Sequence, residues 1–345
     1  MTDYKNLKLI ATSSPHIRAA ETTRSIMLDV IIAMVPALVW AVITFGVEAL
    51  LLTAVSVVGC VFWEWLYRKL MKKPQSVGDL SAVVTGMLLA FVCPPSTPLW
   101  MILIGDFFSI VVVKQLFGGI GKNFVNPALA GRAFLLGSYA GVMTTWIDPA
   151  ANKAPLMGST ADIVTSATPL AYMKGTGDAV AASFAELTGK YSVTDMFLGN
   201  IGGSLGEVSA LALLIGGIYL IARKVITWHI PVAYLGTVAV LTFLFPRGND
   251  PLTFMLYNLL GGGLMLGAFF MATDYVTSPV TSKGRIVFGI GCGLLTVFIR
   301  YFGGYPEGVC YSILIMNCTT WLIDKYMRPA RFGVVKGEKK EAAKK

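Results

Sequence analysis

Residues 26–45, IMLDVIIAMVPALVWAVITF, and residues 47–66, VEALLLTAVSVVGCVFWEWL, are two apolar runs separated by a single glycine. A helix needs about 20 mostly apolar residues to cross the hydrocarbon core of a bilayer, and each run has that length. Because a helix satisfies its backbone hydrogen bonds within the segment, these runs predict an all-α membrane protein.

The composition of the whole chain supports the same class. Of its 345 residues, 55% are hydrophobic and 14% are charged, whereas soluble domains have roughly 25% charged residues. The first 25 residues are polar and basic without an apolar core, so we expect no cleavable signal peptide. The net charge of +9 comes from basic residues beside the apolar runs, so nucleic acid is not an expected partner.

Ten apolar segments fit the pattern of a membrane span, and we predict about ten transmembrane helices. They are residues 26–45, 47–66, 80–94, 98–116, 124–143, 206–222, 229–246, 255–273, 286–302 and 307–324. The third segment is short and ends at Cys93-Pro94-Pro95. Proline interrupts a helix, so we expect a broken or re-entrant helix there.

The basic residues predict the sidedness of the chain. With the N-terminus inside, 22 of the 28 lysines and arginines lie in cytoplasmic segments near the span ends. We therefore expect the N-terminal segment 1–25 and the basic tail 325–345 to be cytoplasmic. Residues 144–205 then form a large extracytoplasmic loop, which is either a functional element or a disordered spacer.

Two short motifs indicate an internal repeat. Phe117-Gly118-Gly119 recurs as Phe302-Gly303-Gly304, 185 positions later. Five predicted spans (26–143) precede the outer loop and five (206–324) follow it, and an odd number of spans inverts the second copy. We therefore predict two five-span inverted repeats, with broken helices and binding sites near the middle of the membrane.

Ionisable residues inside predicted spans are candidates for functional roles, because they are costly to insert. Arg132 and Asp106 are of this kind, although they could instead pair with each other or reach the membrane interface. At the repeat offset, Arg132 aligns with Asn317. The run Gly261-Gly262-Gly263, with Gly267, indicates close approach of backbone or ligand, or ordinary packing through small residues.

Metal sites are not predicted. The cysteines lie within or at the ends of apolar segments, at Cys60, Cys93, Cys292, Cys310 and Cys318. None forms a CxxC pair, so they are expected to be small buried hydrophobic residues rather than zinc or iron–sulfur ligands. His16 and His229 are isolated in the sequence, which argues against a haem or metal site.

The predicted outer loop contains a motif with chemical meaning. Residues 162–168, Asp-Ile-Val-Thr-Ser-Ala-Thr, resemble a covalent flavin attachment signal of the form Asp-Gly-x-Ser/Thr-Gly/Ser-Ala-Thr. In that signal the phosphate of FMN is esterified to the final threonine. Ile163 stands where glycine is usual and Ser166 is the less common choice, and a turn-forming Ser/Thr loop is the alternative. A flavin tethered to a membrane protein implies electron transfer.

With these features, the chain resembles the D subunit of the Rnf complex over nearly its whole length. It is more distantly similar to the B subunit of the sodium-pumping NADH:quinone oxidoreductase. The resemblance is carried by Thr165-Ser166-Ala167-Thr168-Pro169-Leu170. Supporting segments are Ser13-Ser14-Pro15-His16, Lys122-Asn123-Phe124-Val125-Asn126-Pro127-Ala128 and Ala272-Thr273-Asp274.

The resemblance implies a function in the bacterial cell membrane. Rnf complexes couple electron flow between ferredoxin and NAD⁺ to the movement of sodium ions or protons. Their D subunit carries covalent FMN and can hold a noncovalent riboflavin. Matched by position, Thr168 is the FMN attachment residue. The recognition segment consists of Asp162, Thr165, Ser166 and Ala167.

The resemblance also implies partners. They are membrane lipid, a second flavinylated subunit, iron–sulfur subunits, an NADH-site subunit and an external flavin transferase that attaches the FMN. The chain itself has no GxGxxG dinucleotide loop and no ferredoxin-type cysteine run. We therefore expect a relay within an assembly, with no complete catalytic site of its own.

Two alternatives come from other functional classes. Inverted five-span repeats are also typical of small-solute channels and secondary transporters, and covalent flavin would distinguish the two. The chain could also be a structural anchor for redox partners. Sodium ions and protons both fit the sequence, which does not identify the riboflavin residues.

Overall fold

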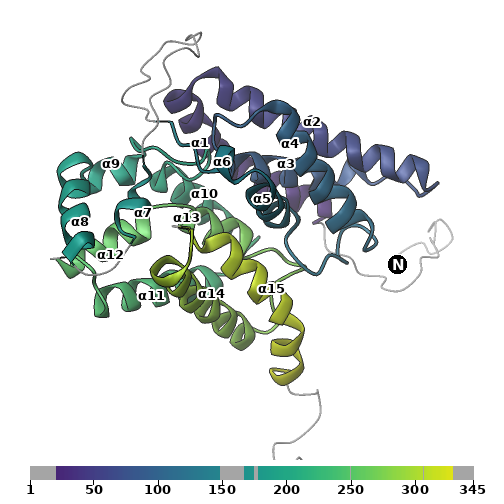
Figure 1. Ribbon diagram of the computed structural model, residues 1–345. Coiled ribbons are helices and arrows are strands. Elements are labelled where there is room, and N and C mark those ends of the chain that lie inside the picture. The colour runs from purple at the N-terminus through teal and green to yellow at the C-terminus, as the bar shows by residue number, and fades with distance from the viewer. Residues whose placement is uncertain (1–20, 148–166, 175–177, 249, 306, 329–345) are drawn as a thin grey trace, which may run out of the picture.

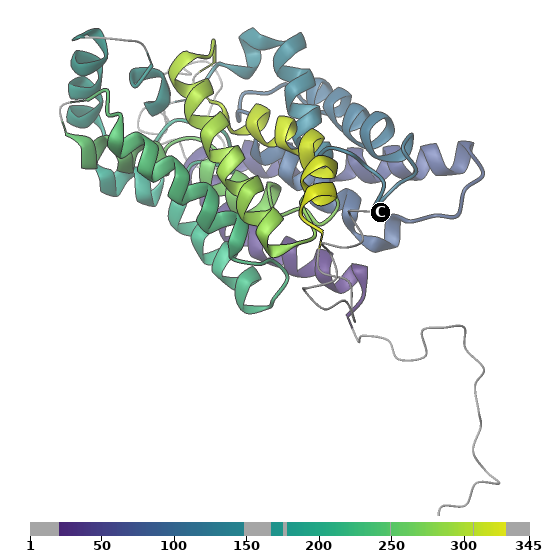
Figure 2. The same ribbon diagram turned by 90° about the horizontal axis from the view of Figure 1, so that it is seen from below.

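The computed structural model describes residues 21–147, 167–174, 178–248, 250–305 and 307–328. All regular elements within these ranges are helices, which confirms the prediction of an all-α chain. Figure 1 shows two groups of helices side by side, the first purple to blue and the second green to yellow. Figure 2 shows from below that α15 lies between α14 and the first group.

The first group has α2 at its centre, packed against α3 and α4. Its main helices are α1 (Thr23–Phe45), α2 (Val47–Leu70), α3 (Ser81–Phe91), α4 (Leu99–Phe107), which continues as the π-helix η3 (Phe108–Gln115), and α5 (Pro127–Ser138). Two short helices belong to the same part of the chain: η2 (Val77–Asp79) lies between α2 and α3, and α6 (Ala140–Met143) follows α5. The single glycine between α1 and α2, Gly46, has φ +82°, a conformation that side chains disfavour.

The second group is built around α14, which packs against α11 and α15. Its helices are α10 (Ala210–Ala222), α11 (His229–Leu244), α12 (Pro251–Leu260), α13 (Leu264–Leu266), the π-helix η5 (Gly267–Met271), α14 (Ser282–Phe302) and α15 (Val309–Tyr326). Between the two groups along the chain come α7 (Pro169–Tyr172), α8 (Asp178–Lys190) and α9 (Val193–Leu198).

Each of the ten predicted spans overlaps at least one of these helices, although several of the helices are shorter than a full membrane crossing. Three helices in the described ranges, α1, α2 and α14, are long and apolar enough to cross a membrane. A fourth candidate is the bent unit formed by α12, α13 and η5. The structure therefore supports a multi-pass membrane protein, and the ten-span topology stays a prediction.

Segments that are not helical contribute to the contact between the two groups. Helix α3 ends at Phe91, before the prolines, and α10 begins only at Ala210, after a non-helical segment (199–209). The Leu205 N–H donates to the Cys93 carbonyl at 3.1 Å, and the Gly206 N–H donates to the Phe91 carbonyl at 2.8 Å. These two bonds pair carbonyls at the end of α3 with N–H groups of the non-helical segment, as buried backbone groups require.

Equivalent helices of the two predicted repeats pair in antiparallel fashion. Asp29, early in α1, accepts a hydrogen bond at 2.9 Å from Tyr219, late in α10. Cys310 at the start of α15 donates to the Leu129 carbonyl of α5 at 3.4 Å, while Asn317, further along α15, lies beside Asn126 at the start of α5. An inverted repeat requires this relation between copies.

Candidate functional site

Thr168 immediately precedes α7 as its N-cap residue. Pro169 occupies the first helical position, where its fixed φ fits and its missing N–H costs nothing. The half-buried Thr168 side chain makes no capping hydrogen bond, so its hydroxyl is not used by the helix. Of the predicted recognition segment, Ala167 is exposed, and Asp162, Thr165 and Ser166 lie outside the described residues.

The buried side chain of Leu170 anchors this segment on the second group. It packs against Gly262, whose φ is +67°, and a Cβ built on Gly262 would lie 2.4 Å from the Leu170 Cδ1 atom. Gly262 therefore allows close packing of a protein side chain. At Gly267 a Cβ would lie 2.4 Å from Val309 of α15, which is the packing through small residues that the sequence offered as one alternative. Close approach of a ligand to the glycine run stays a prediction.

The same glycines break the helix between α12 and α13, where the axis bends by 62°. A break leaves the last carbonyls of α12 without helical partners. The buried guanidinium of Arg300 in α14 donates to the carbonyls of Asn258 and Gly261. A cation at the carbonyl end of a helix is also favourable electrostatically.

Arg132 of α5 binds two carboxylates that are distant in the sequence. Its Nη1 lies 3.1 Å from Glu207 Oε1 and 2.8 Å from Glu307 Oε1, and its Nη2 contacts Glu307 Oε2. The Arg132 guanidinium therefore binds both carboxylate oxygens of Glu307, which is the strongest geometry for an arginine–carboxylate pair. Arg132 is 4% exposed. The alternative in which Arg132 pairs with Asp106 is wrong, since Asp106 bonds Ser56 and Cys60.

The sequence contained no signal for the two glutamates, because each stands near the beginning of a predicted span. Glu207 is in the non-helical segment, and Glu307 precedes α15. Gly263 makes room for both: a Cβ there would lie 2.4 Å from Glu207 Oε1 and 2.8 Å from Glu307 Oε1. The helix break thus positions the carboxylates as well as the Thr168 segment.

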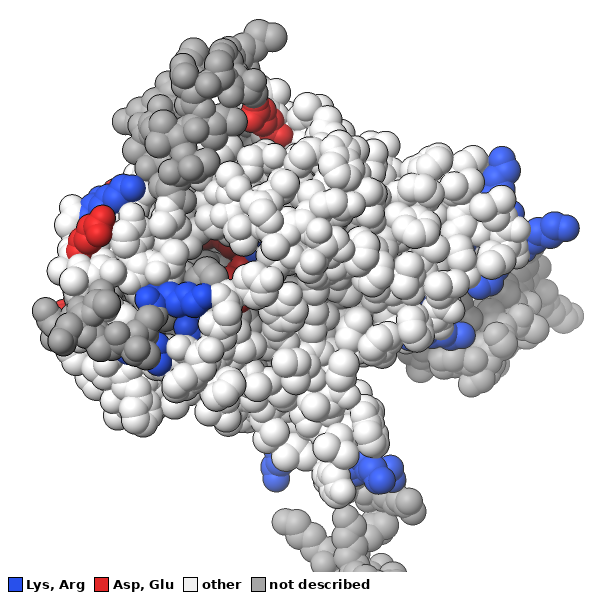
Figure 3. Space-filling view, in the orientation of Figure 1, with Lys and Arg blue, Asp and Glu red and all other residues white. Residues whose placement is uncertain are grey.

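Thr168 lines a cavity of about 30 Å³ together with Glu207, Glu307, Gly262 and Trp146. Figure 3 shows charged atoms recessed in a hollow of this face, close to α7 and α13 in Figure 1. A cavity of this size holds about one water molecule. The predicted attachment residue and the two glutamates bound to Arg132 therefore line one small cavity, whose walls are otherwise mostly apolar.

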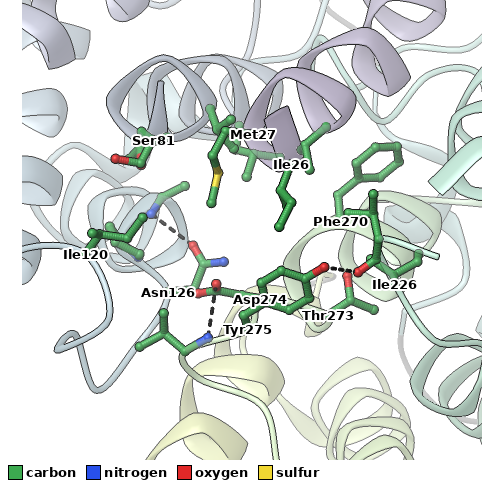
Figure 4. Close-up of a pocket in the computed structure, with 18 of the residues that line it drawn as sticks. Ile26, Met27, Ser81, Ile120, Asn126, Ile226, Phe270, Thr273, Asp274 and Tyr275 are labelled. Atoms are coloured by element: carbon green, nitrogen blue, oxygen red, sulfur yellow. Dashed lines mark hydrogen bonds between the residues drawn. The ribbon is translucent and has the colours of Figure 1, made fainter. Parts of the chain in front are cut away.

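A second cavity, of about 250 Å³, lies between the two groups at the other end of α5. Ile26 and Met27 of α1 face Asn126, Asp274 and Tyr275 across it, and Phe270 closes one side (Figure 4). Most of its lining is apolar. The segments 122–128 and 272–274, which carry the family resemblance, both contribute lining residues.

Hydrogen bonds join the two groups at this second cavity. The Asn126 Oδ1 caps α5 by accepting from the Ala128 N–H at 3.0 Å, and its Nδ2 donates to the Met271 carbonyl at 3.3 Å. Burial raises the pKa of the Asp274 carboxyl, against hydrogen bonds from Val276 and Thr277 that lower it. The amide of Asn126 and the carboxyl group of Asp274 are thus held in place at the mostly apolar wall of the second cavity.

Lys114 of η3 reaches the edge of the second cavity and is itself paired. Its Nζ lies 2.7 Å from Glu64 Oε2 and 2.6 Å from Ser81 Oγ. Lys114 stands near the end of the predicted span 98–116, and it is buried together with Glu64. Within the described ranges, no group of three or more His, Cys, Asp and Glu side chains could hold a metal ion.

Comparison with known proteins gives a consistent result. A family model described as the NQR2, RnfD, RnfE family matches residues 10–333. The D subunit of the Na(+)-translocating ferredoxin:NAD(+) oxidoreductase complex of Acetobacterium woodii is 50% identical over 339 residues, covering 98% of this chain and 99% of the relative. The D subunit of the proton-translocating ferredoxin:NAD(+) oxidoreductase complex of Clostridium ljungdahlii is 44% identical, covering 95% and 97%.

Proposed function

The chain belongs to the NQR2, RnfD, RnfE family, and we propose that it is the D subunit of an ion-translocating ferredoxin:NAD⁺ oxidoreductase complex. The observation that carries this function is the 50% identity to a protein of that name over almost the full length of both chains. The protein is a membrane subunit of this electron-transport complex. A solute channel or transporter is not favoured.

We further propose that Thr168 carries FMN through a phosphoester bond. Three observations support this site: the threonine ends the attachment-like heptad, its hydroxyl makes no capping bond, and its segment is anchored by Leu170 on Gly262. The adjacent cavity of about 30 Å³ is too small for a flavin ring. A tether therefore suits this site, because burial in the cavity could not hold the cofactor. A bound flavin would supply two-electron acceptance with one-electron release.

The residues around Thr168 have definable tasks in this proposal. Leu170 and Gly262 hold the attachment segment against the break in α12 and α13. Arg132 pairs with both Glu207 and Glu307 and offsets one negative charge of the two carboxylates, so the charges beside Thr168 are held in fixed positions. Such fixed charges are what a protein contributes to the electrostatics of a redox cofactor.

For the noncovalent riboflavin we propose the second cavity. Ligand sites are mostly apolar, with a few placed polar groups, and have volumes of about 300–1,000 Å³. The cavity of about 250 Å³ approaches that range and offers apolar walls at Met27 and Phe270, with amides at Asn123 and Asn126. Lys114 places a paired cation at its edge.

The remaining assignments are proposals that follow from the family and from the charge pattern. The termini face the cytoplasm and the segment around Thr168 faces the outer side of the bacterial cell membrane. The partners are the other Rnf subunits, including a second flavinylated subunit and iron–sulfur subunits, and an external flavin transferase. Since the relatives are named for both Na⁺ and proton translocation, the transported ion is left open.

The test of covalent attachment is the pair of variants Thr168→Ala and Thr165→Ala, produced together with a flavin transferase. We expect Thr168→Ala to insert in the membrane without covalent flavin fluorescence after denaturing electrophoresis. Thr165→Ala is the matched control and keeps its fluorescence. An FMN adduct on another residue by peptide mass spectrometry, or fluorescence in Thr168→Ala, would remove this site.

A further inference from the structure

Asp106 is a buried carboxyl group that belongs to neither cavity. It lies in α4 with 0% exposure, facing α2. Its Oδ1 is 2.7 Å from the Ser56 Oγ and 3.2 Å from the Cys60 Sγ. Within the described ranges no Lys, Arg or His forms an ion pair with it, and the nearby Lys114 is paired with Glu64.

The number of hydrogen bonds that this cluster can form depends on the protonation state of Asp106. The Ser56 hydroxyl lies within hydrogen-bond distance of Asp106 Oδ1 and of the Gly86 carbonyl, at 2.9 Å. A hydroxyl has one hydrogen, and the carbonyl can only accept. If Asp106 is ionised, Ser56 can donate to one of the two oxygens and the other contact is between acceptors. If Asp106 carries a proton, it donates to Ser56, which donates to Gly86, and both contacts become hydrogen bonds.

The cost of burial favours the same state. An ionised carboxylate taken out of water without a counter-ion is expensive, and neutralisation by a proton avoids that cost. The second oxygen, Oδ2, is buried without a hydrogen-bond partner. An unpaired oxygen costs less on a neutral acid than on a carboxylate. Gly59 leaves space for it, since a Cβ there would lie 2.5 Å from Oδ2.

We propose that Asp106 is a proton-binding site within the first group of helices. The folded chain holds it as a neutral carboxylic acid that donates to Ser56 and accepts from the thiol of Cys60. The titratable groups around it are Cys60 on α2 and, further away, Cys93 and the Lys114–Glu64 pair. The site is independent of both flavin proposals, because it shares no residue with either cavity.

Infrared spectroscopy of the purified full-length chain at neutral pH tests this proposal. We expect a carbonyl-stretch band of a protonated carboxylic acid that is lost in Asp106→Asn. Asp29→Asn is the matched control, since Asp29 is paired with Arg223 and should contribute no such band. A band that is unchanged in Asp106→Asn would overturn the proposal. So would a band that disappears when sodium chloride replaces choline chloride, because that result identifies a sodium-bound carboxylate.

Two further variants keep the test decisive if Asp106→Asn fails to insert. Ser56→Ala and Cys60→Ala each remove one hydrogen-bond partner while leaving the acid in place. We expect the band to persist and to move in frequency in both. A band whose frequency is the same in both variants as in the unchanged protein does not belong to Asp106 and refutes the assignment.

Discussion

The two ends of the antiparallel pair formed by α5 and α15 differ in charge and in space. At one end Arg132 binds Glu207 and Glu307 around a cavity of about 30 Å³. At the other end Asn126 and Asn317 meet beside a cavity of about 250 Å³ with mostly apolar walls. We call the first the ionic end, because an arginine and two glutamates nearly fill it, and the second the open end, because its cavity is larger and has Asp274 and the paired Lys114 at its wall.

This difference supports the proposal that the two ends serve two kinds of cofactor attachment. An apolar cavity can retain a ligand through burial, whereas a cavity for one water molecule cannot. We therefore propose a tether on Thr168 at the ionic end and noncovalent binding at the open end. The following variants test the comparison by altering one end at a time.

The largest effect is expected from Arg132→Leu, which leaves two buried carboxylates without their cation. Removing one partner of a buried ion pair costs about 3–5 kcal/mol, and we expect a corresponding loss of unfolding free energy. Arg223→Leu is the matched control, because Arg223 is 60% exposed in its pair with Asp29. Such an exposed pair contributes at most about 1 kcal/mol.

Thermal unfolding of the detergent-solubilised chain measures both variants. A further combination of Arg132→Leu with Glu207→Gln and Glu307→Gln should recover part of the loss, because it removes the unpaired charges. Equal losses in Arg132→Leu and Arg223→Leu would show that the ionic end is not a buried cluster.

An intermediate effect is expected at the open end. Val84→Phe adds a ring to a residue that lines the second cavity, so we expect loss of most of the noncovalent flavin. The measurement is the amount of noncovalent flavin that the purified protein releases on denaturation. The covalent flavin on Thr168 should be unchanged. Val58→Phe, at a 67% exposed position on α2, is the control for a larger side chain. Unchanged release from Val84→Phe would exclude this cavity as the riboflavin site.

The smallest effect is expected from Gly262→Ala, which disturbs the support of Thr168. Its φ of +67° and the contact with Leu170 predict a cost of about 1–3 kcal/mol. We also expect slower FMN attachment, because Leu170 must shift. Gly236→Ala in α11 is the control: its Cβ meets open space, and replacing a helical glycine stabilises by about 0.5–1 kcal/mol. Equal stability and equal flavin fluorescence in the two variants would contradict this account of Gly262.

The antiparallel pairing of α5 and α15 explains where residues 185 positions apart in the sequence lie. Arg132 and Asn317 align in the sequence, but they lie at opposite ends of the α5–α15 pair, beside Glu307 and Asn126 respectively. In the predicted inverted repeat, equivalent sequence positions are expected at opposite depths. Equivalent polar positions therefore contribute to different sites.

Several features could be predicted from the amino-acid sequence because they depend on neighbouring residues. Apolar length indicated the helices, proline after Cys93 indicated the end of α3, and the heptad singled out Thr168. Each signal is contained in about 20 residues or fewer, so hydrophobicity and local backbone restraints suffice to produce it. The family resemblance likewise rests on short runs of residues.

The partners of the buried charges could not be predicted in this way. Arg132 is 75 residues from Glu207 and 175 residues from Glu307, and Asp106 is 50 residues from Ser56. Each buried charged side chain pairs with a polar group that the packing brings close to it. No fixed distance along the sequence therefore relates the partners. The second cavity depends in the same way on two segments that fold together from opposite halves. Long-range packing decided these sites, because burial forces polar groups to find partners and the chain sequence does not say which ones will be near.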